Sequence, residues 1–371
     1  MKTNELSQTK PHYEILDGLR GVAAIMVLGF HVLEAYYVSS PTGKFDQLLN
    51  HAYLAVDFFF VLSGFVIGYA YDERWGRMSV GGFLKRRIIR LHPMVVFGTL
   101  LGVVLFYFGA SEVFPLVSAV PLWKVLLYAV LGMLMIPTPP SVDIRGWQEM
   151  YTLDAPIWTL AFEYFANVFY ALFARKFTKV ALAILVSLAA CATLYVTLTQ
   201  GDVIGGWSID ANNMRIGFTR LMYPFFAGLL LYRLGKVIRI RQAFLWCSLL
   251  LVGVLSVPRI GGPESLWANG LYEAAIILLV FPLIVAVGAG GRVKGKFTSQ
   301  LCKFLGDMSY PIYLVNYPLC YVHTAWNSEA KNTFTEAGWT PYAVFVAVLA
   351  LSYVAMRWYD IPVRKWLRKF Q

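Results

Sequence analysis

The residues with the most evident chemistry lie inside stretches that are otherwise apolar. The stretch LDGLRGVAAIMVLGFHV, residues 16–32, carries Arg20 and His31 eleven positions apart. Because a helix turns about 100° per residue, the two side chains share one face, roughly 16 Å apart along the axis. Neutral imidazole is the usual general base near pH 7. The pair predicts acid–base chemistry in a buried passage; the alternative is an interfacial Arg20 paired with Asp17 and a His31 that only makes a helix contact.

A carboxylate and a basic cluster supply two further candidate sites. Glu163 lies among aromatic residues in APIWTLAFEYFANVFY (155–170), where it needs a partner such as an imidazole, an arginine or a substrate hydroxyl. The segment LKRRIIRLHP (84–93) holds Arg86, Arg87 and Arg90. Arginine forks match phosphate oxygens, so this cluster predicts a phosphorylated ligand. The alternatives are a structural ion pair at Glu163 and an ordinary basic flank of a span.

Other polar residues in or beside apolar stretches are candidates for substrate contact or for support of the site. Ser63 lies in AVDFFFVLSGFVIGYAY (55–71), where it and Gly64 can equally serve close helix packing. The four cysteines form no CxxC pair, and we expect no metal site. The remaining candidates are Asp17, Asp57, Trp158, Ser309, Tyr310 and Asn316.

The composition places all of these residues in a membrane. Of the 371 residues, 58% are hydrophobic and 14% are charged, and the apolar residues come in runs of about twenty. Such a run crosses a hydrocarbon core of about 30 Å. The net charge of +11 comes from Lys and Arg in loops beside these runs. This placement is typical of topology signals, and we expect membrane lipid, and no nucleic acid, as a partner.

Charge also predicts the topology. All strong basic clusters fall on one side if the N-terminus is cytoplasmic and residues 122–136 do not cross. The sequence therefore predicts an all-α, polytopic transmembrane bundle with both termini cytoplasmic and a re-entrant or interfacial segment near 122–136, inside an external loop of about 111–156. We expect one integral-membrane domain over 1–371 with no appended soluble domain. The ten expected spans are 17–38, 53–71, 93–110, 157–174, 177–199, 217–235, 243–258, 269–290, 308–326 and 340–358.

Five short motifs follow one another along the chain: Arg20 with His31, Asp57-Phe58-Phe59 with Ser63-Gly64, Arg87 with Arg90, Trp158-Thr159-Leu160 with Glu163, and Ser309-Tyr310 with Tyr313-Leu314. In this order they resemble the motifs of the membrane-bound acyltransferase-3 family of bacterial O-acyltransferases, and the resemblance runs from about residue 14 to 367. Three positions depart from the family pattern: Thr159 replaces a commoner Ser, Asn316 stands where many members have His, and Asp360 replaces a Glu.

The resemblance implies an enzyme of the bacterial inner (plasma) membrane that transfers an acyl group, most commonly acetyl, from cytoplasmic acyl-CoA to a hydroxyl of a carbohydrate. The acceptor would be a surface polysaccharide, a lipid-linked sugar or a glycoside. In this interpretation Arg86, Arg87 and Arg90 bind the phosphates of acetyl-CoA. His31 is the general base, and Glu163 orients either His31 or the sugar.

Two other classes of protein fit part of the sequence. A transporter or exporter would use Arg20, His31 and Glu163 as an intramembrane relay, although the two halves show no obvious repeat or paired broken helices. A non-catalytic assembly scaffold is the second alternative. In the acyltransferase interpretation Arg20 guides the donor. The acceptor, the acyl chain and the oligomeric state stay open.

Overall fold

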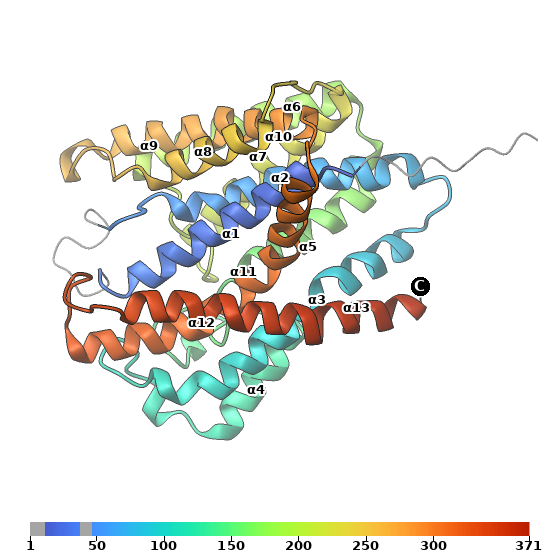
Figure 1. Cartoon of the computed structure of the whole chain (residues 1–371). Coiled ribbons are helices and arrows are strands. Elements are labelled where there is room, and N and C mark those ends of the chain that lie inside the picture. The colour runs from blue at the N-terminus through green and yellow to red at the C-terminus, as the bar shows by residue number, and fades with distance from the viewer. Residues whose placement is uncertain (1–11, 38–46, 371) are drawn as a thin grey trace, which may run out of the picture.

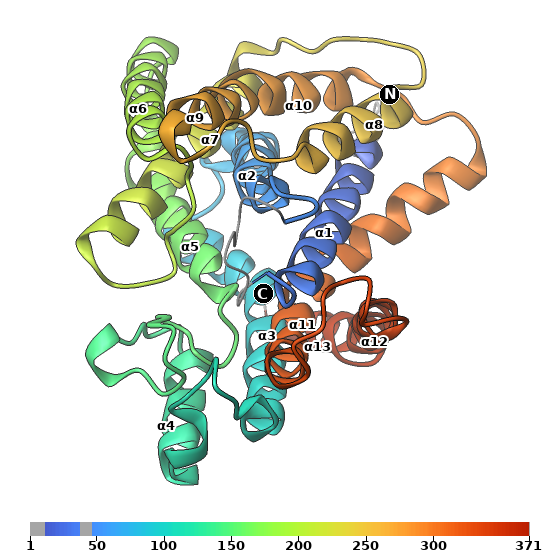
Figure 2. The same cartoon turned by 90° about the vertical axis from the view of Figure 1, so that its left-hand side faces the viewer.

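The chain folds into a bundle of helices. The computed structural model describes residues 12–37 and 47–370, and all regular elements in these two ranges are helical. Figure 1 shows the long helices running side by side, and Figure 2 views many of them close to end-on. The helices are α1 (Glu14–Glu34), α2 (Ala55–Tyr71), α3 (Val80–Leu105), α4 (Leu122–Met133), α5 (Ile157–Leu172), α6 (Lys179–Gln200), α7 (Ala211–Leu234), α8 (Ala243–Ser256), α9 (Leu266–Ala275), α10 (Phe281–Gly290), α11 (Lys296–Ala330), α12 (Thr340–Val354) and α13 (Ile361–Leu367).

Each of the ten stretches predicted to span the membrane overlaps a helix, and the stretch 269–290 comprises α9, a π-helical turn and α10. The last residue of the predicted span 17–38 lies outside the described residues. By length and composition, six helical segments of the described chain can cross a membrane. The other four predicted spans correspond to α5, α7, α8 and α11, which are shorter or more polar. The predicted all-α, multi-span class is therefore confirmed. The six segments are Glu14–Glu34, Ala52–Arg74, Val80–Gly109, Lys179–Gln200, Pro263–Gly290 and Thr340–Phe370.

Both described ends of the chain lie at the same end of the bundle. In Figure 1 the start of α1 and the end of α13 both lie on the right-hand side. Lys85, near the start of α3, donates a hydrogen bond to the backbone oxygen of Phe370. That this end faces the cytoplasm stays a prediction.

Helix α3 begins earlier than expected. Its predicted span starts at residue 93, but the helix starts at Val80, where the side chain of Ser79 accepts a hydrogen bond from the Gly82 N–H at 3.1 Å. Pro93 removes one backbone hydrogen bond, yet the helix continues through it. The basic cluster is therefore part of the helix, and Arg87 lies about 10 Å along the axis from its start.

Two glycines let α2 and α7 pack with their backbones in contact. A Cβ atom at Gly64 would lie 1.8 Å from the Phe225 carbonyl oxygen, and one at Gly228 would lie 2.0 Å from the Val61 carbonyl oxygen. Small residues allow this approach between membrane helices. At Gly64, the packing alternative therefore describes the structure.

The segment between α3 and α5 forms a layer against one side of the bundle. The predicted non-crossing segment 122–136 contains α4, whose 12 residues extend about 18 Å, less than the hydrocarbon core. The loop after α4 is held by Arg145, whose guanidinium lies 3.6 Å from the centre of the Tyr321 ring. Tyr321 in turn donates a hydrogen bond to the carboxylate of Glu149.

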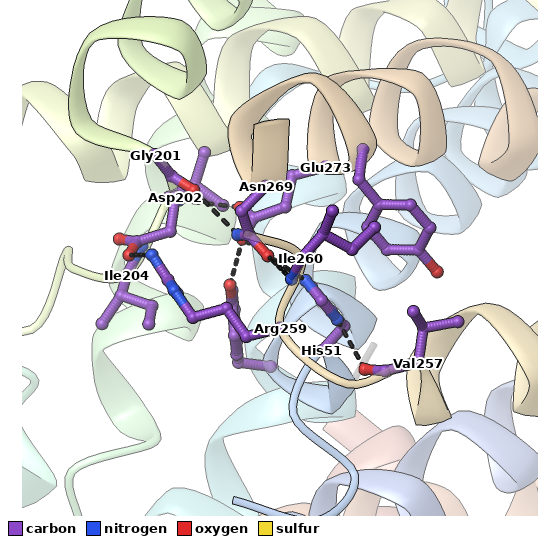
Figure 3. A network of polar contacts seen from close by, with 12 residues as sticks. His51, Gly201, Asp202, Ile204, Val257, Arg259, Ile260, Asn269 and Glu273 are labelled. Atoms are coloured by element: carbon purple, nitrogen blue, oxygen red, sulfur yellow. Dashed lines mark hydrogen bonds and ion pairs between the residues drawn. The ribbon is translucent and has the colours of Figure 1, made fainter. Parts of the chain in front are cut away.

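A buried polar network ties together loops near the start of α2 (Figure 3). The ring nitrogens of His51 lie 2.8 Å from the Val257 carbonyl oxygen and 2.9 Å from Oδ1 of Asn269. Arg259 donates to Asp202 at 2.7 Å. Burial lowers the pKa of His51, which precedes the first turn of α2. The network therefore links segments that are far apart in the chain.

Candidate active site

A cavity of about 490 Å³ lies inside the bundle, near the end where α1 begins. Side chains from α1, α2, α3, α5, α11 and the α12–α13 region line it. Its lining is charged in one part and apolar in another, with Val56, Phe59 and Leu160 in the apolar part. The long basic side chains that line it are Arg20, Arg87, Arg90, Lys303 and Arg364.

The predicted basic cluster on α3 and the predicted carboxylate Glu163 on α5 meet in this cavity. Nη2 of Arg87 lies 2.5 Å from Oε1 of Glu163, and the Ser63 hydroxyl donates to the same oxygen at 2.8 Å. The Arg87 and Glu163 side chains are 6% and 16% exposed. The early start of α3 brings Arg87 to the level of Glu163. The ion-pair alternative thus describes the contacts of Glu163, whose partners are Arg87 and Ser63 rather than His31.

Arg90 stands apart from the other basic residues of the cavity. Arg20 pairs with Asp17 at 3.0 Å, as the interfacial alternative supposed, yet both line the cavity. Within the described chain, Arg90 makes no hydrogen bond or ion pair, although Arg20, Arg87 and Arg364 are close enough to act on its charge. Its side chain is exposed and lines the cavity. An unpaired guanidinium beside other arginines is a favourable position for an anion.

Further charged residues complete the cavity wall. Arg364 pairs with Asp360 at 2.5 Å, and Lys303 pairs with Asp307 at 2.5 Å. Asp360 departs from the family's usual Glu but still binds an arginine one helical turn away. Arg86, the third arginine of the predicted phosphate cluster, is exposed and does not line the cavity.

His31 does not line this cavity. It contacts α11 about one helical turn beyond the last α11 residue of the lining. Its Nδ1 lies 2.9 Å from Oε2 of Glu34, and its ring makes an edge-to-face contact with Tyr317, with centroids 4.7 Å apart. Tyr317 follows Tyr313, which lines the cavity, by about one turn of α11. The face of α1 that Arg20 and His31 were predicted to share therefore turns towards α11.

Phe59, Leu160 and Tyr313, with Thr159 beside Tyr313, form the apolar part of the cavity. We call these side chains the Tyr313 layer. The Tyr313 hydroxyl lies 2.8 Å from Oγ1 of Thr159. Because Thr159 donates to the Pro156 carbonyl at 2.9 Å, Tyr313 is the donor in their shared hydrogen bond. The ring of Phe59 packs edge-on against Tyr313 with centroids 5.8 Å apart. Thr159 thus keeps the hydroxyl of the serine that is commoner at this position.

Two predicted site residues, Asp57 and Trp158, do not line the cavity. Asp57 pairs with Arg220 at 2.8 Å, with the two side chains 0% and 3% exposed. The Arg220 guanidinium also lies 5.5 Å from the Trp158 ring. Arg220 was missed in the sequence, although an arginine inside a predicted span is itself a signal. These three residues support the site by joining α2, α5 and α7.

The remaining candidates lie on α11. Ser309 and Tyr310 line the cavity, and their hydroxyls donate to the carbonyls of Gly306 at 2.8 Å and Leu91 at 2.6 Å. The Asn316 amide is fully buried and donates to carbonyls of its own helix. Across the described ranges, His, Cys, Asp and Glu side chains form no group of three able to hold a metal ion.

Comparisons with known proteins identify the family of the chain. A family model described as "Acyltransferase domain" (Acyl_transf_3) matches residues 13–357. "Protein 2 in picA locus" of Rhizobium radiobacter is 32% identical over 181 residues, which cover 47% of this chain and 88% of that protein. No solved structure matches the chain. The match covers the five lining helices α1, α2, α3, α5 and α11 and ends just before Asp360 and Arg364. The chain belongs to the acyltransferase-3 family of membrane acyltransferases.

Proposed function

We propose that this acyltransferase uses acyl-CoA, with acetyl-CoA as the first choice, and acylates a hydroxyl of a carbohydrate at the bacterial inner membrane. The observation that carries the proposal is one cavity that has arginines in one part and apolar side chains in another. Acyl-CoA has the same division, with phosphates on its nucleotide and a thin pantetheine arm ending in a thioester. Among the arginines, unpaired Arg90 is the first phosphate ligand.

The apolar part of the cavity is where the thioester would react. With the phosphates at Arg90 and Arg87, the acyl end lies beside Tyr313, and His31 lies one helix turn beyond. Entry of the acceptor past Tyr317, which contacts the His31 ring, would bring the hydroxyl between His31 and the thioester.

The chemical step is direct transfer. Glu34 accepts the hydrogen bond of the His31 Nδ1–H, which leaves Nε2 as the base. His31 takes the proton of the acceptor hydroxyl as the oxygen attacks the thioester carbonyl. The C–S bond then breaks, the ester forms, and the proton is passed to the sulfur of the departing coenzyme A. Glu34 thus replaces Glu163 as the residue that orients His31.

The experiment is label transfer. Membranes that contain the protein are incubated with acetyl-CoA labelled in the acetyl group, and the label on cell-envelope glycan is measured. We expect transfer by the wild type and a loss of about 10²–10⁴-fold for His31→Ala at equal protein level. Arg86→Gln, which lies outside the cavity, serves as the matched control. Full activity of His31→Ala contradicts the base assignment, and absence of transfer by the wild type contradicts acetyl-CoA as donor.

A further inference from the structure

We propose that the apolar end of the cavity selects the acyl group, and that Phe59, Leu160 and Tyr313 restrict the donor to short, uncharged acyl chains. This inference rests on the proposed function, because it takes the coenzyme A phosphates to lie at the arginines. It goes further by naming the class of acyl group and the side chains that select it.

Three helices close this end of the cavity. Phe59 comes from α2, Leu160 from α5 and Tyr313 from α11, and all three line the cavity. Leu160 and Tyr313 are only 4% and 7% exposed. The Tyr313–Thr159 hydrogen bond of 2.8 Å joins α11 to α5, and the edge contact of Phe59 with Tyr313 joins α2 to α11. A longer acyl chain on the donor would therefore meet side chains held in place by three different helices.

The layer has a firm support behind it. The Asp57–Arg220 pair is almost completely buried, and Trp158 packs near the same guanidinium. Separating such a pair leaves an uncompensated buried charge, which is strongly unfavourable. The end of the cavity therefore does not recede easily to admit additional methylenes.

The orientation of the donor follows from the separation of charge along α11. Lys303 and Tyr313 both line the cavity, and their ten-residue spacing corresponds to about 15 Å along the helix. The arginines Arg20, Arg90 and Arg364 belong to the charged part with Lys303, and Phe59 belongs to the part with Tyr313. Phosphates at the first part direct the thioester to the second.

The same layer disfavours a charged acyl group such as succinyl. The hydroxyls of Tyr313 and Thr159 are used by one another and by the Pro156 carbonyl. Phe59 and Leu160 offer no hydrogen-bond donor. A carboxylate placed here would lose its hydration without gaining a partner, and that loss is large.

The test is competition binding on the purified full-length chain in detergent. Radiolabelled acetyl-CoA is displaced by unlabelled acetyl-, butyryl-, hexanoyl- or succinyl-CoA. For the wild type we expect hexanoyl- and succinyl-CoA to need at least about tenfold higher concentration than acetyl-CoA, since excess methylenes in a closed pocket cost about tenfold or more. Phe59→Ala is expected to improve hexanoyl-CoA about tenfold relative to acetyl-CoA and to leave succinyl-CoA weak.

The matched control is Phe165→Ala on α5, because Phe165 is 44% exposed and does not line the cavity. This variant should bind the four thioesters in the same order of affinity as the wild type. Phe59→Leu, a smaller change, should shift hexanoyl-CoA in the same direction if Phe59→Ala does not fold. Equal displacement by all four thioesters, or an unchanged order in the Phe59 variants, overturns this inference and leaves the proposed function intact. Absence of any acyl-CoA binding by the wild type overturns both.

Discussion

Arg90 is the residue on which the donor site depends most. Arg20, Arg87 and Arg364 each pair with a carboxylate, whereas Arg90 is without such a partner in the described parts of the chain. A paired arginine already has its charge balanced, so Arg90 can give an incoming phosphate the strongest charge-assisted hydrogen bond.

Replacing Arg90 should therefore weaken donor binding without unfolding the protein. We expect Arg90→Gln to weaken acetyl-CoA binding about tenfold or more, because a hydrogen bond to a charged group contributes about 1.5–3 kcal/mol. Arg86→Gln, four positions earlier and outside the cavity, should change it less than about twofold. Dissociation constants of both purified variants check this, and equal effects of the two would rule out a special role for Arg90.

Arg87 should behave differently from Arg90, because its charge is balanced by Glu163. Arg87→Met leaves the Glu163 carboxylate with the Ser63 hydroxyl but without its counter-ion in a largely buried site, which we expect to lower the free energy of unfolding by about 3 kcal/mol. The double variant Arg87→Met/Glu163→Leu should recover part of this loss, since neither charge remains. Thermal unfolding in detergent measures both; a double variant no more stable than the single one would contradict the account.

At the residue scale, the sequence identified the charged groups better than their partners. Arg20, Arg87, Arg90 and Glu163 could be found because a charged side chain inside an apolar run is costly and needs a reason. That Glu163 meets Arg87 rather than His31 could not be predicted. The contact joins α3 to α5, and it depends on where α3 begins.

At the scale of elements, the packing of α2 on α7 positions one wall of the cavity. Gly64→Ala puts a methyl group against the Phe225 carbonyl oxygen, and we expect a loss of about 1–3 kcal/mol in unfolding free energy. Gly253→Ala on α8 is the matched control, since no atom lies within 4 Å of the added Cβ. Unfolding temperatures should fall for the first and hold or rise for the second. A Gly64→Ala protein as stable as Gly253→Ala would show that the helices are farther apart.

The loop between α4 and α5 should respond to pH through Glu149. Burial raises the pKa of Glu149 from its ordinary 4.5 to about 8. The folded state therefore binds the Glu149 proton more tightly than the unfolded state does. The contribution of this proton to the free energy of unfolding is fully present below about pH 4.5 and is lost as the pH rises to about 8. The slope between these values is at most about 1.4 kcal/mol per pH unit.

The variant Glu149→Gln isolates this effect. Its unfolding temperature should depend less on pH between about 6 and 8 than that of the wild type, and it should exceed the wild type most at the upper end of that range. Glu112→Gln, in the same loop region but on an exposed residue, is the control. An identical pH dependence for Glu149→Gln and the wild type would show that Glu149 is not buried as described.

The sequence predicted where the helices lie more reliably than it predicted where each helix begins. Apolar runs of the right length located all ten predicted spans on helices. The segment 122–136 contains the short helix α4, and that it does not cross the membrane stays a prediction. The start of α3 was placed too late because Pro93 suggested an entry point. The cap at Ser79 and the continuation through Pro93 depend on local and tertiary contacts that hydropathy does not report.

At the scale of the whole molecule, the family match and the cavity support one account of acyl transfer. The chain matches the acyltransferase family over most of its length, and the cavity gathers side chains from six parts of that length. The sequence alone suggested a continuous face from Arg20 to His31. In the structure the part of α1 between them is buried, with Ala24 and Val27 almost fully covered, and His31 contacts Tyr317 instead of lining the cavity.

The measurement closest to the central proposal is equilibrium binding of labelled acetyl-CoA to the purified chain, with unlabelled coenzyme A and free acetate as competitors. We predict saturable binding that coenzyme A displaces and acetate does not, weakened about tenfold or more by Arg90→Gln and unchanged by Arg86→Gln. Binding that is not saturable, or that is equally strong in wild type and Arg90→Gln, would contradict the assignment of this cavity to the acyl donor.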